Sequence, residues 1–79
     1  MPIVLRIGGY AIGFFSADRN ERPHVHVSRA GKLAKFWLDP VELAKNRGFS
    51  KVELNGARKI VWQHQIALAE QWHEYFKNA

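Results

Sequence analysis

Two histidines, His24 and His26, lie two residues apart in the segment 22–28, which has the alternating pattern of a β-strand. Side chains alternate between the two faces of a strand, so both imidazoles should project from one face and the intervening valines from the other. Imidazole is the side chain that gains and loses a proton most readily near neutral pH. The pair is therefore the first candidate for chemistry in this chain.

An acid–base pair of imidazoles can cleave RNA without a metal ion. One histidine would take the proton of a ribose 2′-hydroxyl, and the other would protonate the leaving oxygen. Nearby cations would stabilise the negative charge that develops on the phosphate. Under this hypothesis the protein is a metal-independent ribonuclease without a cofactor, and its catalytic residues are His24, His26, Lys35 and Arg29.

Two other uses of the histidine pair stay open. Two imidazoles on one strand face can form half of a metal site, whose third ligand would have to come from Asp18, Glu21, Asp39 or His64. The chain has no cysteine, so thiolate ligands are excluded. Alternatively, the histidines have a structural role and hydrogen-bond the polar loop of residues 16–22.

Size and charge limit the class of protein. The 79 residues suffice for a single domain, residues 1–79. Twelve Lys and Arg against seven Asp and Glu give a formal charge of +5, which permits nucleic acid, an acidic substrate or an acidic partner. No stretch approaches the roughly 20 apolar residues of a membrane span, and the first residues do not resemble a signal peptide. We therefore expect a cytoplasmic protein that does not enter a membrane.

The first half of the chain predicts two β-hairpins. The first covers residues 3–15 and turns at Gly8-Gly9, because glycine accepts the positive φ angles of tight turns. Its buried face should carry alternate apolar residues, which are Ile3, Leu5, Ile7, Tyr10, Ile12 and Phe14. The second hairpin runs from His24 to Leu38 and turns at Ala30-Gly31.

The register of the second hairpin places His24 opposite Trp37 and His26 opposite Lys35. Val25, Val27, Ala34, Phe36 and Leu38 then form the apolar face. Trp37 could stack on a base, and neighbouring cations could contact phosphates. The candidate nucleic-acid-binding residues are Trp37, Lys35, Lys32 and Arg22.

The second half predicts one long helix. Residues 41–47 fit either a short edge strand or a helical turn. Ser50 and Glu53 have the spacing of a capping box, and helical apolar spacing continues to Phe76 with an interruption at Asn55-Gly56. The expected fold is α+β: an antiparallel sheet of two hairpins, with four or five strands, packed against one long C-terminal helix.

Trp62 and Ile66 lie roughly one helical turn apart and outside the main apolar stripe of the predicted helix. If the sheet does not cover them, they form a small exposed apolar patch. Such a patch favours contact with another protein or a homodimer. These two residues are the candidate partner-binding residues.

Several stretches match, in order, the pattern of a known family. They are Val4–Gly8, Pro23–Val27, Ala34–Val41, Gly48–Ser50, Glu53-Leu54, Ile60-Val61 and Trp72–Phe76. On these residues the chain resembles a family of small bacterial proteins catalogued as domain of unknown function 4160. The resemblance implies a genomic context: such proteins are often encoded beside a second small protein, in gene pairs similar to toxin–antitoxin modules.

Two hypotheses of different classes follow. In the first, the protein belongs to a two-gene module, binds the small protein encoded by the neighbouring gene, and acts as a toxin on RNA through the strand with His24 and His26. In the second, it is a non-catalytic regulatory module that binds a protein or nucleic acid, RNA or DNA, with its basic face.

Overall fold

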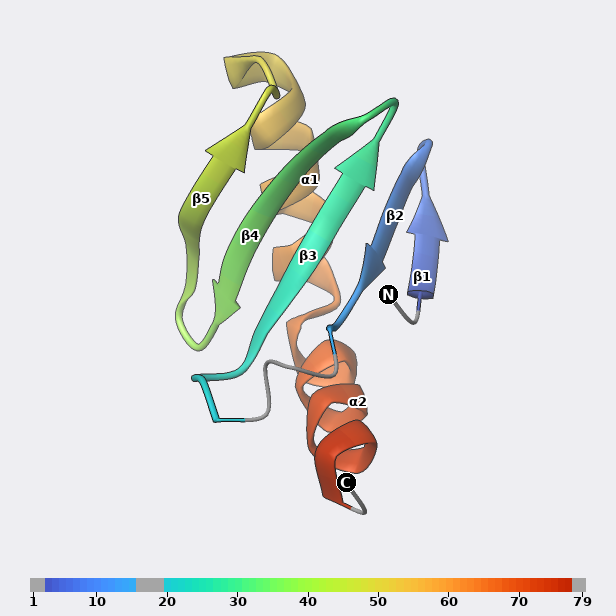
Figure 1. The fold of residues 1–79 in the computed structure, drawn as a ribbon, viewed down its shortest axis with the longest axis vertical. Coiled ribbons are helices and arrows are strands. Elements are labelled where there is room, and N and C mark those ends of the chain that lie inside the picture. Colours follow the sequence, from blue (N-terminus) through green and yellow to red (C-terminus); the bar gives the residue numbers. More distant parts are fainter. Residues whose placement is uncertain (1–2, 16–19, 78–79) are drawn as a thin grey trace.

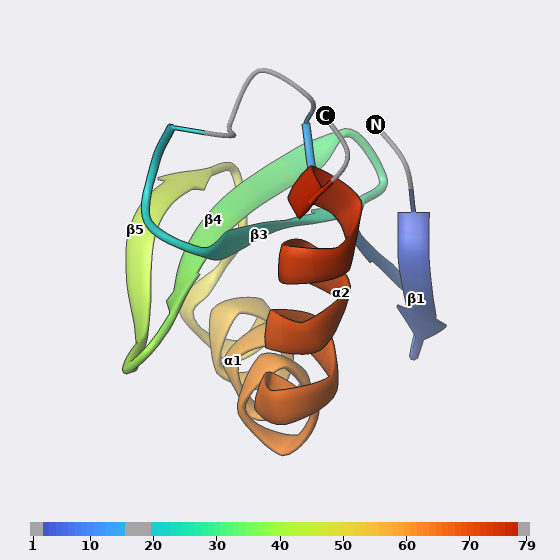
Figure 2. The ribbon, with the colours of Figure 1, turned by 90° about the horizontal axis from the view of Figure 1, so that it is seen from below.

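The computed structural model describes residues 3–15 and 20–77, and within them the chain forms five strands and two helices. These are β1 (Ile3–Ile7), β2 (Tyr10–Gly13), β3 (His24–Arg29), β4 (Lys32–Leu38), β5 (Val41–Arg47), α1 (Lys51–Gln63) and α2 (Gln65–Lys77). The strands form one antiparallel sheet in sequence order. Both helices cover the same face of this sheet (Figures 1 and 2). The α+β prediction is confirmed.

The first hairpin pairs across the Gly8-Gly9 turn as predicted, except at its outer end. The register shifts between Ile3 and Leu5 through a β-bulge. Ile3 is consequently exposed, whereas Val4 packs against the core. The predicted burial of Ile3 is wrong because the extra residue of a bulge breaks the alternation of side chains along the strand.

The second hairpin has the predicted register. His24 pairs with Trp37, and His26 pairs with Lys35. The predicted apolar face is almost completely buried, with Val25, Val27, Phe36 and Leu38 at 0% exposure and Ala34 at 1%. The two hairpin strands therefore present one apolar face to the helices, as the sequence indicated.

Residues 41–47 form the strand β5, which settles the choice between a strand and a helical turn. β5 pairs with β4 along its whole length, with a register shift beside Lys35. A turn with a cis peptide bond between Asp39 and Pro40 connects the two strands. β5 completes the sheet at the edge opposite β1 (Figure 1).

The prediction of one long helix is wrong, because the helical backbone breaks at His64 with φ −109° and ψ 15°. Hydrogen bonds still bridge the break, from the His64 N–H to the Ile60 carbonyl and from the Leu68 N–H to the His64 carbonyl. The Gln65 side-chain amide also donates to the Leu38 carbonyl oxygen at 2.6 Å, which ties the junction to the end of β4. The chain thus turns at the junction and continues as a second helix.

Asn55-Gly56, where an interruption was expected, lies within α1. A Cβ at position 56 would be 3.1 Å from the Tyr10 hydroxyl oxygen. That hydroxyl donates a hydrogen bond of 2.8 Å to the Glu53 carbonyl oxygen. Gly56 therefore permits close contact between α1 and β2.

Candidate functional site

His24, the first residue of β3, is completely buried. Its ring lies beside those of His26, Trp37 and Trp72, with centroid separations of 5.1, 5.6 and 4.9 Å. Its Nδ1 is 2.8 Å from the Arg22 carbonyl oxygen. Because a carbonyl oxygen only accepts, Nδ1 carries the proton of this hydrogen bond. His24 therefore belongs to an aromatic cluster that joins the end of the sheet to α2.

His26 is only partly buried and has a different environment. It contacts the exposed ring of Phe15, with centroids 4.3 Å apart, and lines a shallow pocket on the sheet. Both imidazoles lie on the sheet face opposite Val25 and Val27, as predicted, but His24 is completely buried there. A catalytic group must touch the reacting atoms, and of the two histidines only His26 lines the pocket.

Trp37 lies on the same face, where two cations contact its indole. The Arg22 guanidinium is 4.7 Å and the Lys35 ammonium 4.6 Å from the ring centroid. Lys35 also pairs with Glu21 at 2.6 Å, and Arg22 donates to the Asp39 carbonyl oxygen at 3.2 Å. These cations occupy ring surface that a stacked base would need, so Trp37 is poorly placed for stacking.

The other two predicted cations lie away from the histidines. Arg29 is at the far end of β3, where its guanidinium is 5.1 Å from the Tyr10 ring centroid. Lys32 binds both carboxylate oxygens of Glu53, at 3.0 and 2.8 Å. The structure therefore brings Lys35 next to His26, but it does not bring Arg29 or Lys32 to that place.

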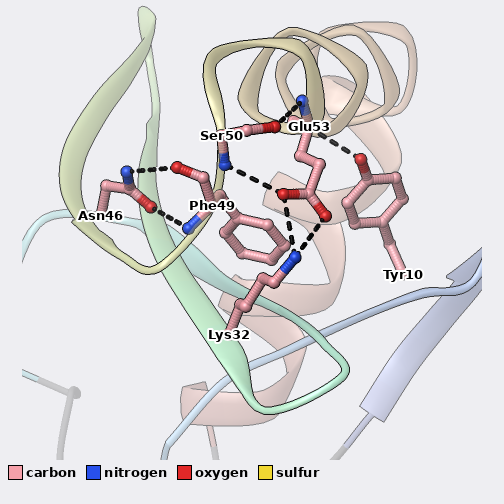
Figure 3. A network of polar contacts seen from close by, with 6 residues as sticks. All are labelled: Tyr10, Lys32, Asn46, Phe49, Ser50 and Glu53. Carbon is pink, nitrogen blue, oxygen red and sulfur yellow. Dashed lines mark hydrogen bonds and ion pairs between the residues drawn. The ribbon is translucent and has the colours of Figure 1, made fainter.

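Lys32 and Glu53 belong to a structural network at the start of α1 (Figure 3). Ser50 and Glu53 form the predicted capping box, in which the Glu53 carboxylate accepts from the Ser50 N–H and the Ser50 hydroxyl accepts from the Glu53 N–H. Hydrogen bonds from Lys32 and from the Ser50 backbone lower the pKa of Glu53 from 4.5 to about 2. This network fastens α1 to the β3–β4 hairpin.

The pocket beside His26 lies on the open face, which we define as the sheet face opposite α1 and α2. It has a volume of about 270 Å³ and is lined by Glu21, His26, Leu33, Ala34, Lys35, Lys45 and Arg47. The strand register explains the positive charge of the pocket. Lys35 is the cross-strand neighbour of both His26 and Lys45, and Arg47 is the cross-strand neighbour of Leu33. A row of nitrogen-bearing side chains therefore crosses three adjacent strands.

Lys45 and Arg47 were absent from the predicted site because residues 41–47 could not be assigned to a strand from the sequence. Lys45 and Arg47 are two positions apart on β5, so their side chains project from the same face of the sheet. Among residues 3–15 and 20–77, neither forms an ion pair. They are the most available cations of the pocket.

No group of three or more potential metal ligands occurs in the described part of the chain. Of the predicted third ligands, Glu21 is paired with Lys35, and Asp18 lies outside the described residues. Most of the loop that the histidines were expected to order, residues 16–19, also lies outside them. Asp39 and His64 likewise form no group of three potential ligands with the histidines within the described residues.

Trp62 and Ile66 are exposed, at 67% and 77%, so the sheet leaves uncovered the patch that the helical spacing indicated. They lie on either side of the helix junction and line a groove of about 420 Å³ with Gln63, His64, Gln65, Ala67 and Glu70. This groove is formed by the helices, whereas the basic pocket is formed by the open face.

The fold and site define a small α+β protein whose meander sheet is covered by helices on one face and carries a basic pocket on the other. Residues 9–73 match the family described as Domain of unknown function (DUF4160), so the chain belongs to this family. Neither a curated protein nor a solved structure matches the chain. Within the described residues, neither helix has the length and apolar character needed to cross a membrane.

Proposed function

We propose that this protein is a non-catalytic module that binds single-stranded nucleic acid on the open face. The observation that carries the proposal is the row of His26, Lys35 and Lys45 across β3, β4 and β5, with Arg47 beside it. Phosphate contacts supply most of the affinity of non-specific nucleic-acid binding. A pocket lined by three cations suits such contacts.

The pairing of Lys35 with Lys45 supports a bound anion. Like charges directly opposite each other on neighbouring strands destabilise a sheet. Glu21 offsets the charge of Lys35, but no described residue forms an ion pair with Lys45 or Arg47. A phosphate between these side chains would relieve the repulsion.

The open face also suits an extended ligand. Antiparallel sheets backed by helices are a recurring platform for single-stranded RNA, a parallel of architecture only. A second cross-strand row begins at Arg6 on β1 and ends at Arg47 on β5, so cations occur at both edges of this face. The ring of Phe15, whose centroid is 4.3 Å from that of His26, adds an aromatic group beside the pocket.

The binding test uses fluorescence anisotropy with labelled single-stranded RNA and DNA. If Lys35, Lys45 and Arg47 each contact one phosphate, the logarithm of the binding constant should fall with the logarithm of salt concentration with a slope of about −2. Lys45→Ala and Arg47→Ala should each reduce the slope by about 0.7. Lys51→Ala, which removes an exposed cation from the helical side, is the matched control. Equal losses in all three variants, or no binding, would refute the proposal.

A second candidate function, a toxin that cleaves RNA, rests on the position of His26 beside Lys35 in the pocket. Gel analysis of the RNA from the binding assay distinguishes the two candidates. Intact RNA supports the binding module, whereas cleavage that is lost in His26→Ala supports the toxin. Growth arrest on expression, relieved by the neighbouring gene's product, would further support the toxin–antitoxin context.

A further inference from the structure

We propose that two copies of this chain form a two-fold symmetric dimer through the outer surface of α1 and α2, centred on Trp62 and Ile66. Five exposed residues, each four positions apart, form a stripe along this surface: Arg58, Trp62, Ile66, Glu70 and Glu74. Residues four apart lie on the same side of a helix and form a continuous ridge. Trp62 at the end of α1 and Ile66 at the start of α2 line the same groove, so the stripe continues across the junction at His64.

The order of residues in the stripe makes it complementary to itself. Trp62 and Ile66 are equally spaced on either side of His64, and Arg58 and Glu70 are equally spaced beyond them. When two copies meet antiparallel, with the two-fold axis at the junction, Arg58 of each copy faces Glu70 of the other, and Trp62 faces Ile66. A two-fold interface requires this kind of match between a surface and itself.

The charges of the two helices favour a second copy over an unrelated partner. The exposed side of α1 carries Lys51, Arg58 and Lys59, whereas α2 carries Glu70 and Glu74, with Lys77 in its last turn. No described residue forms an ion pair with Arg58, Lys59, Glu70 or Glu74. Antiparallel contact places the basic half of one copy against the acidic half of the other.

The groove at the junction provides the central contact. Trp62, Ile66 and Glu70 line it, and the indole of Trp62 is 67% exposed beside it. In the two-fold arrangement, the indole of each copy enters the groove between Ile66 and Glu70 of the other. Buried aromatic residues at the centre of an interface contribute most of its binding energy. Both basic pockets stay accessible because they lie on the opposite faces of the sheets.

Sedimentation equilibrium over a range of protein concentrations tests the proposal. The wild type should show a monomer–dimer equilibrium, and Trp62→Ala should raise the dissociation constant about 30-fold. Arg58→Glu and Glu70→Arg should each raise it at least about tenfold, because like charges then face each other. Arg47→Glu makes the same change of charge on the open face and should leave the dimer intact.

The decisive sample is an equimolar mixture of Arg58→Glu and Glu70→Arg chains. In a mixed dimer both charged pairs are again opposite in sign, so the mixture should regain nearly wild-type association, as should the double variant. A wild type that is monomeric at every concentration, single variants that dimerise normally, or a mixture that stays monomeric would each overturn the proposal. Circular dichroism spectra and melting midpoints verify that every variant is folded.

Discussion

The two faces of the sheet are made by alternate residues of the same strands, yet they have opposite roles. Val25 and Phe36 are completely buried beneath the helices, whereas their neighbours His26 and Lys35 line an open pocket. The covered face supplies the apolar burial that stabilises the fold. The open face is not covered by the helices, and its pocket carries the cations Lys35, Lys45 and Arg47.

The two histidines show the same difference within one strand. His24 lies at the end of the sheet, where Trp72 of α2 covers it, while His26 lies between Phe15 and the pocket. Identical side chains on nominally the same strand face therefore have different access to ligands. The histidine pair marks the edge of the candidate site, and only one member belongs to it.

The largest expected effect separates the two faces by stability. Phe36→Ala should reduce the free energy of unfolding by about 3–5 kcal/mol, because it leaves a cavity in the covered face. Lys45→Ala, at an exposed position of the open face that has no ion pair with a described residue, should change it by less than about 0.5 kcal/mol. Urea denaturation followed by circular dichroism measures both values. Similar losses would show that the open face also stabilises the fold.

The second prediction separates the two histidines. His24→Ala should cost about 2 kcal/mol, since it removes a fully buried ring and its hydrogen bond to the Arg22 carbonyl. His26→Ala should cost less than about 1 kcal/mol, because its ring is partly exposed. Urea midpoints of the two variants provide the test. An unchanged midpoint for His24→Ala would contradict the structural role that its burial assigns to His24.

The third prediction concerns the start of α1. Ser50→Ala should reduce the free energy of unfolding by about 1 kcal/mol, because the Glu53 N–H loses its acceptor. The neighbouring exposed substitution Lys51→Ala is the control and should leave the melting midpoint nearly unchanged. If the melting midpoints of both variants equal that of the wild type, the capping box does not contribute to stability.

The smallest effect is a dependence on pH. The pKa of Glu53 is about 2 in the folded protein against an ordinary value of 4.5, so its ionised form stabilises the fold above the ordinary value. This contribution is lost as pH falls from about 4.5 toward 2. The stability difference between wild type and Glu53→Gln should therefore be largest near neutral pH and shrink through this range. Urea titrations at several pH values measure it, and a constant difference would contradict the assigned pKa.

Local signals in the sequence were sufficient for most of the fold. The Ala30-Gly31 turn and the alternation of Val25 and Val27 fixed the register of the second hairpin, because a slip by one residue would expose the apolar side chains. The spacing of Ser50 and Glu53 located the helix start. In contrast, the bulge beside Ile3 and the break at His64 have no comparable local signal.

The sequence by itself determined the α+β class, the histidine-bearing strand, the helix cap and the exposed positions of Trp62 and Ile66. Tertiary structure alone decided that Trp72 covers His24, that Lys32 binds Glu53, and that β5 brings Lys45 and Arg47 to His26. The physical reason is the range of the interactions. Alternation, turns and caps depend on residues close in the chain, whereas access to a side chain depends on which distant segment packs against it.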